Sequence, residues 1–323
     1  MKHQSERKIS GIAIIWGMLL MAVLFAGCTG NSPQPAATAA PLTPAAATPA
    51  APAAHPSAQA PVTAAPTLVP PAPVATTTPA PVYTSSEGNV VAFAAASLKG
   101  VSSQLAADYA KMYPGHSVVF NLDGTQALKT QVQNGAYADI FISASNSYSN
   151  ELTKGGYFAD GTVKPLATNY IIVILPAGNP ANIRSPADLA KPGVKIAMED
   201  KAVPAGTATC AVLANLAKST YNADWNTSVF KNVVTYETSE PGVATKVQLG
   251  EVDAGFVYES TAIAAKPGTY ATLTIPKKDN YLQTYTIGVL KGSQSTGAAR
   301  DFENFMLSGA GQQDLKEYGF RPA

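Results

Sequence analysis

From residue 90 to the C-terminus, short apolar runs alternate with segments of helical periodicity, and this alternation constrains the fold most. The first cycle is an apolar run at residues 90–94, a helical pattern at 98–112 and a second apolar run at 117–121. Another series starts with the apolar run at 170–175. Strands that alternate with helices on this scale predict βαβ units, with parallel sheets covered by helices on both faces.

The other predicted elements extend this pattern into two similar parts. Further strands are predicted at residues 139–143, 195–198, 233–236, 254–258, 271–275 and 284–290, and further helices at 126–134, 147–154, 205–219, 241–249, 297–307 and 312–318. We expect an α/β fold of two lobes. Strand C-termini and helix N-termini then face a cleft between the lobes, which suits a small ligand.

The start of the chain has the organisation of a secretory signal. Basic residues Lys2, Arg7 and Lys8 precede an apolar stretch, and small residues come directly before Cys28. This order predicts a lipoprotein signal peptide over residues 1–27 and lipidation of Cys28. An uncleaved membrane anchor is the alternative. Both interpretations place the rest of the chain on the outer face of the cytoplasmic membrane, in an extracellular or periplasmic space.

The next segment, residues 28–86, consists mainly of Pro, Ala, Thr, Ser and Val and has no charged side chain. Such a sequence cannot bury a core, and its prolines favour extended conformations. We expect a disordered linker that holds the folded part away from the membrane.

The composition of the folded part excludes several classes of function. Of the 22 basic and 21 acidic side chains, three and one lie in the first 27 residues, so the remainder is close to neutral. A nucleic-acid partner, which needs a basic face, is therefore not expected. Cys210 has no second cysteine near it for a disulfide, and His116 is the only histidine of this part. A zinc or copper site is not expected either.

The segment Phe93-Ala-Ala-Ala-Ser97-Leu98 places a serine where a strand leads into a helix. Helix N-termini carry unpaired N–H groups and the positive end of the helix dipole, which suit an anion. By itself, such a serine is more often only a helix cap.

Other strand-to-helix corners offer similar neutral donors and no lysine or arginine. They contain Thr125 after Asp123-Gly124, Ser143-Ala144-Ser145, Val203-Pro204-Ala205-Gly206-Thr207, Ser239-Glu240-Pro241, and Tyr258 at a strand end. Together they predict a site for a small, strongly charged oxyanion, which hydrogen bonds would hold in place of its hydration shell.

An enzyme is poorly supported by the same residues. A serine nucleophile needs a base beside it, and His116 lies at a predicted strand start, where a surface position is expected. Asp139 and Asp253 lie at strand edges, where helix capping or solvation is the ordinary role. We therefore expect no catalytic residue and no cofactor.

Several segments, in order and spacing, resemble the periplasmic molybdate-binding proteins of ABC transporters. They are Phe93-Ala-Ala-Ala-Ser97-Leu98, Gly135-Ala-Tyr-Ala-Asp139-Ile-Phe-Ile-Ser143-Ala144, Val203-Pro-Ala-Gly206, Gly255-Phe-Val-Tyr258 and Tyr318-Gly-Phe320. The resemblance covers nearly all of residues 90–320. It implies a type II binding-protein fold, in which two crossovers join one lobe of residues 87–168 plus 290–323 to a second lobe of residues 169–289.

The resemblance also implies a tetrahedral molybdate or tungstate ion between the lobes. The family's ligands fall on the hydroxyls of Ser97 and Thr125, on backbone amides of Ala205 and about Glu240, and on the phenol of Tyr258. No metal site is implied apart from this oxyanion. The implied partners are an ABC permease with its ATPase, and a monomer is expected.

Two departures from the family pattern leave alternatives open. Asp123 places a carboxylate near the anion or points away and caps the following helix. Glu240 lies where a related branch is similar in carrying a coordinating glutamate. The second carboxylate of that branch would fall in Val203-Pro-Ala-Gly206, where none is present, so tetrahedral binding is favoured.

The sequence therefore predicts a lipid-anchored binding protein that captures molybdate or tungstate and delivers it to a permease. Lobe closure is expected around crossovers near Thr168 and Gly288. A binder of phosphate or sulfate is the nearest rival, since Asp123 or Glu240 could accept the proton of a phosphate. A surface enzyme or adhesion module on the same fold is the rival from another class.

Overall fold

The computed structural model describes residues 88–323. The predicted signal peptide, the Cys28 lipidation site and the predicted linker lie outside the described residues. Across residues 88–323, no helix combines the length and the apolar composition that crossing a bilayer requires.

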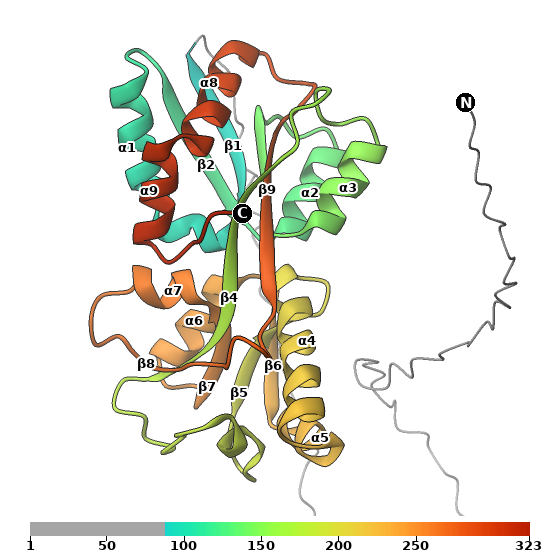
Figure 1. Cartoon of the computed structure of the whole chain (residues 1–323), viewed down its shortest axis with the longest axis vertical. Helices are drawn as coiled ribbons and strands as arrows, with labels where there is room; N and C mark the ends of the chain where they lie inside the picture. Colours follow the sequence, from blue (N-terminus) through green and yellow to red (C-terminus); the bar gives the residue numbers. More distant parts are fainter. Residues whose placement is uncertain (1–87) are drawn as a thin grey trace, which may run out of the picture. The chain divides into compact units, whose positions relative to one another are not determined.

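Two α/β halves lie one above the other, and two long strands run between them (Figure 1). The first half contains β1 (Asn89–Ala95), β2 (Ser117–Asp123), β3 (Ile140–Ser143), η1 (Ala96–Gly100), α1 (Ser102–Met112), α2 (Thr125–Gln133), α3 (Asn146–Lys154), α8 (Thr296–Leu307) and α9 (Gly309–Glu317). The second half contains β5 (Ile196–Glu199), β6 (Val233–Glu237), β7 (Ala254–Tyr258), β8 (Tyr270–Leu273), η2 (Pro186–Ala190), α4 (Pro204–Ser219), α5 (Ala223–Lys231), α6 (Glu240–Gln248) and α7 (Glu259–Ala264).

The two long strands, β4 (Lys164–Pro176) and β9 (Leu282–Val289), connect the halves. They pair with each other, and the strand order through the molecule is β2-β1-β3-β9-β4-β7-β5-β6, with β8 beside β4. The predicted α/β class is confirmed, and the expected parallel strands occur within each half, joined by antiparallel connecting strands. Strand β1 is parallel to β2 and β3, and β5 is parallel to β6 and β7, whereas β4 and β9 are antiparallel to their neighbours. The chain crosses to the second half in one strand and returns in the other, so the two must run in opposite directions.

The core of each half is built from strands that are apolar on both faces. Six of the seven residues of β1 are buried, as expected for a parallel strand covered by helices on both sides. One buried cluster extends from β1 and α8 through β4 to β7, so the apolar packing continues between the halves.

Some local predictions need correction. The helix predicted at residues 98–112 is two elements, the 3₁₀ helix η1 and then α1, joined at Val101. Helices α5 and α7 were not predicted. Asn222 caps helix α5, because its side chain accepts a hydrogen bond from the N–H of Trp225.

Asp139 is a buried structural carboxylate and not the solvated or capping residue that its position suggests. It is 0% exposed. Its carboxylate accepts hydrogen bonds from the N–H of Val91 at 2.8 Å, the hydroxyl of Tyr137 at 2.5 Å and the hydroxyl of Ser293 at 2.6 Å. These bonds tie β1, the approach to β3 and the segment after β9 together. Asp253 is less buried and accepts only from the N–H of Lys195 in the described hydrogen bonds.

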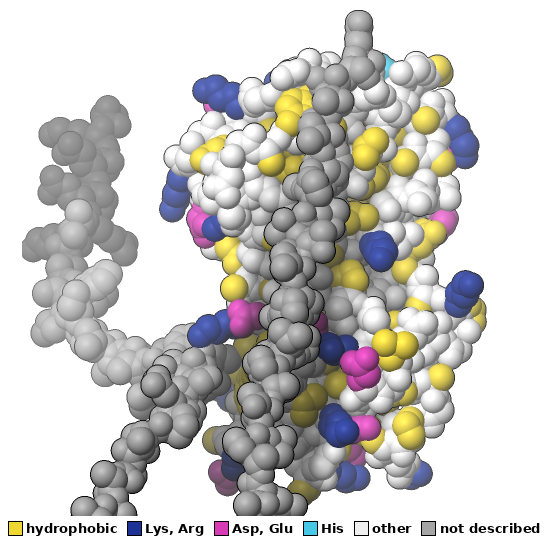
Figure 2. Space-filling model, turned by 180° about the vertical axis from the view of Figure 1, so that it is seen from behind, with side chains coloured by type: hydrophobic (Ala, Val, Ile, Leu, Met, Phe, Trp, Pro, Cys, Tyr) yellow, Lys and Arg dark blue, Asp and Glu magenta, His cyan; other side chains and the backbone are white. Residues whose placement is uncertain are grey.

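Charges on the face opposite to that of Figure 1 are interspersed. Figure 2 shows lysine and arginine side chains scattered among aspartate and glutamate, without one broad basic area on the visible part of this face. This distribution gives no electrostatic footprint for nucleic acid there.

We predict that Asp139→Ala lowers the free energy of unfolding by about 3 kcal/mol or more, because three donors lose a charged acceptor in a site closed to water. Chemical denaturation followed by circular dichroism measures this. Asp160→Ala, which removes an exposed carboxylate, is the matched control and should change the free energy little. Equal effects of the two substitutions would contradict the structural role of Asp139.

Candidate functional site

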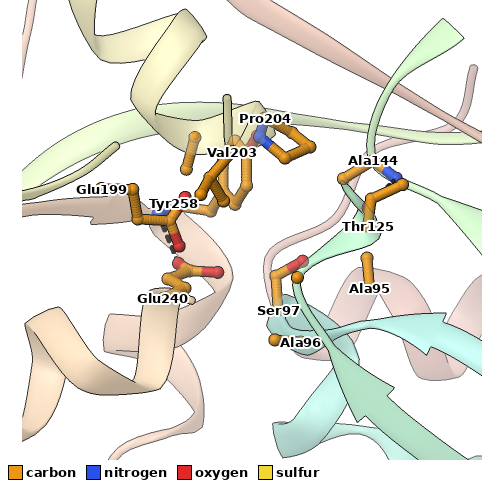
Figure 3. A pocket seen from close by; sticks show the side chains of 12 residues that line it. Ala95, Ala96, Ser97, Thr125, Ala144, Glu199, Val203, Pro204, Glu240 and Tyr258 are labelled. Carbon is orange, nitrogen blue, oxygen red and sulfur yellow. Dashed lines mark hydrogen bonds between the residues drawn. The ribbon is translucent and has the colours of Figure 1, made fainter. Parts of the chain in front are cut away.

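A small cavity lies between the two halves and is lined by strand-to-helix corners of both. Its volume is about 20 Å³, enough for a group of few atoms and too small for an organic metabolite. It is lined by Ala95, Ala96, Ser97, Gly124, Thr125, Ala144, Glu199, Val203, Pro204, Ala205, Glu240 and Tyr258. Figure 3 shows the side chains of the first half facing those of the second across the cavity.

Ser97 contributes a buried hydroxyl from the turn that follows β1. It is 8% exposed, and its Oγ lies 2.8 Å from the hydroxyl of Tyr285 on β9. Burial raises the pKa of Tyr285 well above its ordinary value, so the phenol stays protonated at neutral pH. The contact fixes the position of the Ser97 hydroxyl at the edge of the cavity.

Thr125 is the first residue of α2 and is 1% exposed. Its Oγ1 accepts a hydrogen bond from the N–H of Ala144 at 3.2 Å. Because the hydroxyl accepts there, its own hydrogen remains available to donate to a group in the cavity.

Asp123, the carboxylate left open by the sequence, does not line the cavity. Its Oδ1 accepts from the N–H of Gly124 at 2.7 Å. It therefore turns back to its own chain and is not a helix cap, since α2 has no side-chain cap bond.

Glu199 was missed by the sequence reasoning. It ends β5, is 2% exposed and lines the cavity. The N–H groups of Ala205 and Gly206, in the first turn of α4, donate to its carboxylate. The amide of Ala205, predicted as an anion donor, is thus already engaged by a carboxylate of the chain itself.

Gly206 permits this arrangement because the backbone approaches closely. A Cβ at this position would lie 2.0 Å from the carbonyl oxygen of Asp200. Only glycine lets the first turn of α4 fold over the end of β5.

Glu240 begins α6 and presents its side chain, and not only its backbone, to the site. It is 3% exposed. Its Oε1 accepts from the N–H of Tyr258 and from the hydroxyl of Thr261, each at 2.6 Å. Figure 3 shows the carboxyl groups of Glu240 and Glu199 close to one another on the same side of the cavity.

The electrostatics of the site favour protonated side chains. Burial raises the pKa of Glu199 well above its ordinary value, and the nearby Glu240 raises it further. Burial also raises the pKa of Glu240 to about 7, against the hydrogen bonds from Thr261 and Tyr258. Burial likewise raises the pKa of Tyr258 well above its ordinary value, so its phenol is a donor at neutral pH.

Three buried oxygens in this cavity have no hydrogen-bond partner within the described residues: Glu199 Oε2, Glu240 Oε2 and the hydroxyl of Tyr258. Buried polar atoms are ordinarily satisfied, so three of them around one small space indicate a place for a polar guest.

The long connecting strands carry a polar network beside the site. Tyr285 on β9 interacts with Ser97 and with Asn169 on β4. The Nδ2 of Asn169 donates to the hydroxyl of Ser260 at 2.8 Å. Ser97 in the first half is thereby linked through both connecting strands to α7 in the second.

Hydrogen bonds also join the halves directly. The Nε2 of Gln126 on α2 donates to the carbonyl of Thr238 at 2.8 Å, and the hydroxyl of Tyr148 donates to the carbonyl of Ala202. These contacts hold the two walls of the cavity together.

The structure brings all five residues predicted from the sequence, Ser97, Thr125, Ala205, Glu240 and Tyr258, to this one cavity. His116 lies elsewhere, with its Nδ1 3.2 Å from the hydroxyl of Tyr109. Among the residues that line the cavity, none is a histidine, lysine or arginine.

Comparison with known proteins agrees with this geometry. A family model described as bacterial extracellular solute-binding protein matches residues 90–321. The molybdate-binding protein ModA of Mycobacterium tuberculosis strain H37Rv is 34% identical over 238 residues, which cover 73% of this chain and 86% of that protein.

Two solved structures share the fold. The Azotobacter vinelandii periplasmic molybdate-binding protein aligns with a TM-score of 0.64 and 22% identity, over 72% of this chain and 99% of that one. The sulfate-binding protein SubI of Mycobacterium tuberculosis aligns with a TM-score of 0.65 and 20% identity, over 73% and 88%. The chain therefore belongs to the bacterial extracellular solute-binding proteins, and among them to the family of the molybdate-binding protein ModA.

Proposed function

We propose that this protein captures molybdate or tungstate outside the cytoplasmic membrane and delivers it to an ABC permease with its ATPase. The observation that carries the proposal is the cavity between the halves, where unpartnered buried oxygens and hydroxyl donors converge. The relationship to proteins named for molybdate binding supports the choice of ion. The protein acts as a binding protein without catalysis or a cofactor.

In this proposal each predicted residue has a defined part. The hydroxyls of Ser97 and Thr125 donate from the first half, and the phenol of Tyr258 donates from the second. The amide of Ala205 is shared between the anion and Glu199, and Glu240 contacts the anion through its side chain. Several charge-assisted hydrogen bonds of this kind replace the hydration shell of the ion.

Capture requires the halves to move. We propose that residues 87–168 plus 290–323 and residues 169–289 act as two lobes, which hinge at the connecting strands near Thr168 and Gly288. The bonds from Gln126 and Tyr148 across the cleft support a closed form that seals the ion from water.

The N-terminal residues, which lie outside the described part of the chain, provide the membrane anchor in this proposal. We propose that residues 1–27 are removed as a lipoprotein signal peptide, that Cys28 is lipidated, and that residues 28–86 tether a monomeric binding domain to the outer face of the membrane. No part of this scheme requires nucleic acid.

Phosphate is the second candidate, because the buried carboxyls of Glu199 and Glu240 could accept the hydrogen that phosphate keeps near neutral pH. Sulfate, like molybdate and tungstate, accepts hydrogen bonds and donates none, so in this proposal only the size of the cavity separates these ions.

Calorimetric titration of the purified protein with molybdate, tungstate, sulfate and phosphate tests the choice of ligand. We expect tight one-to-one binding of molybdate and tungstate and weaker binding of sulfate, whose smaller size leaves donors out of reach. Preference for phosphate, or no binding of any of the four ions, would contradict the proposed function.

The double variant Ser97→Ala with Tyr258→Phe tests the site. Each lost hydrogen bond to a charged ligand should weaken molybdate binding by about tenfold or more. Ser103→Ala with Tyr221→Phe removes an exposed serine hydroxyl and a phenol hydroxyl away from the cavity and should leave the dissociation constant unchanged. Unaltered affinity in the first double variant would mean that the ion binds elsewhere.

Gly124→Val tests closure. A Cβ on Gly124 would lie 2.7 Å from the carbonyl oxygen of Thr238 across the cleft, while the φ of −56° is one that valine accepts. We expect faster dissociation of molybdate and a larger radius of gyration by X-ray scattering in its presence. A variant as compact as the wild-type protein would refute this closing contact.

A further inference from the structure

The cavity contains two buried carboxyl groups, which are unexpected in a site for an anion. Glu199 and Glu240 are 2% and 3% exposed, and both line the cavity. Each carboxyl directs one oxygen to hydrogen bonds of the protein and leaves its Oε2 buried without a partner. Buried carboxyls without a cation are uncommon because the charged form loses its hydration.

The groups around the pair do not supply a counter-charge. Tyr258 on β7 and Tyr285 on β9 are the titratable neighbours that interact with both carboxyls, and both are neutral donors. Lys99 and Lys266 line a neighbouring groove and not this cavity. Within residues 88–323, no group of three or more His, Cys, Asp or Glu side chains could hold a metal ion.

An oxyanion of charge −2 cannot enter this space beside two ionised carboxylates without strong repulsion. A protonated carboxyl, in contrast, offers an O–H group to an oxygen of the anion. The unpartnered Oε2 atoms of Glu199 and Glu240 are the positions from which such protons would be donated.

We propose that Glu199 and Glu240 are a proton-holding pair, through which the cleft takes up its oxyanion together with one proton from the solvent. This inference rests on the proposed function and names the form in which that site binds its ligand. Glu199 keeps its proton in the free and the bound protein, and Glu240 gains one when the anion enters. The anion accepts both O–H bonds, and the Oε1 of Glu240 continues to accept from Tyr258 and Thr261.

The direction of the pKa shifts agrees with this assignment. Burial raises the pKa of Glu199 well above its ordinary value and that of Glu240 to about 7. In the free protein the buried pair therefore favours a state with a proton on one carboxyl, and a bound dianion raises the pKa of the other. Affinity should then fall as pH rises, by up to about tenfold per pH unit for each proton taken up.

Calorimetry on the full-length protein between about pH 6.5 and about pH 8.5 tests the proposal, with molybdate kept dilute so that it remains a monomeric dianion. Titrations in two buffers of different ionisation enthalpy count the protons taken up. We expect uptake that approaches one proton at the upper end of this range and a dissociation constant that rises about tenfold per pH unit there. Affinity independent of pH, with no buffer dependence, would overturn the proposal.

Glu240→Gln identifies the group. The carboxamide keeps an oxygen for Tyr258 and Thr261 and places a permanent N–H donor at the Oε2 position. Its affinity for molybdate should lose the pH dependence and exceed that of the wild-type protein at about pH 8.5. Glu251→Gln removes an exposed carboxylate instead, and should retain the wild-type profile. An unchanged pH profile in Glu240→Gln would overturn the assignment.

The free protein provides a test that needs no ligand. A carboxyl whose pKa is raised in the folded state stabilises the protein below its ordinary pKa of 4.5 and loses that contribution as pH rises through about 7. The melting temperature of the wild-type protein should therefore fall between about pH 5 and about pH 8 relative to that of Glu240→Gln. If the melting temperatures of the two proteins changed with pH in parallel, the assignment of Glu199 and Glu240 as a proton-holding pair would be overturned.

The two proposals fail in distinguishable ways. Absence of molybdate binding at every pH contradicts the proposed function, while the melting curves still report on the pair. Binding of molybdate without proton uptake contradicts only the proton-holding pair.

Discussion

The antiparallel pairing of β4 with β9 is the constraint on which the rest of the structure depends. These strands connect the two α/β halves, and the cavity lies between the halves. Tyr285 on β9 also contacts a residue of the cavity, because its hydroxyl positions that of Ser97. The two strands therefore connect the halves and also hold the hydroxyl of Ser97 at the edge of the cavity.

Within this frame, desolvation governs the chemistry of the cavity. In the proposed function it strengthens the hydrogen bonds of Ser97, Thr125 and Tyr258 to the anion, because water does not compete for them. It also raises the free energy of the ionised forms of Glu199 and Glu240. A site that combines neutral donors with protonated carboxyls can bind a dianion without lysine or arginine, and gains a dependence on pH that fixed positive charges would not give.

Much of the fold follows from local patterns in the sequence. The strand and helix starts around Ser97, Thr125, Ala205, Glu240 and Tyr258 were predictable, because apolar runs and capping residues act over a few positions. The opposite direction of the two connecting strands was not, since it depends on how the chain crosses between halves. Helix α7 has only six residues, and α5 was missed although its length and apolar periodicity equal those of the predicted α2.

The buried carboxylates were the main omission. Asp139 and Glu199 look like ordinary residues at strand ends, and their burial arises only when distant segments fold over them. For Glu199 the available signal was Gly206, because glycine in the first turn of a helix after a strand indicates a close backbone approach. That signal locates the contact but does not identify the residue beneath it.

A crystal structure of the protein with tungstate, using the anomalous scattering of tungsten, tests the central claim most directly. The account predicts one strong anomalous peak between the halves, with tungstate oxygens within hydrogen-bond distance of the Ser97 and Thr125 hydroxyls and of the carboxyl of Glu240. A peak at any other place, or a cavity that stays empty at saturating tungstate, would contradict it.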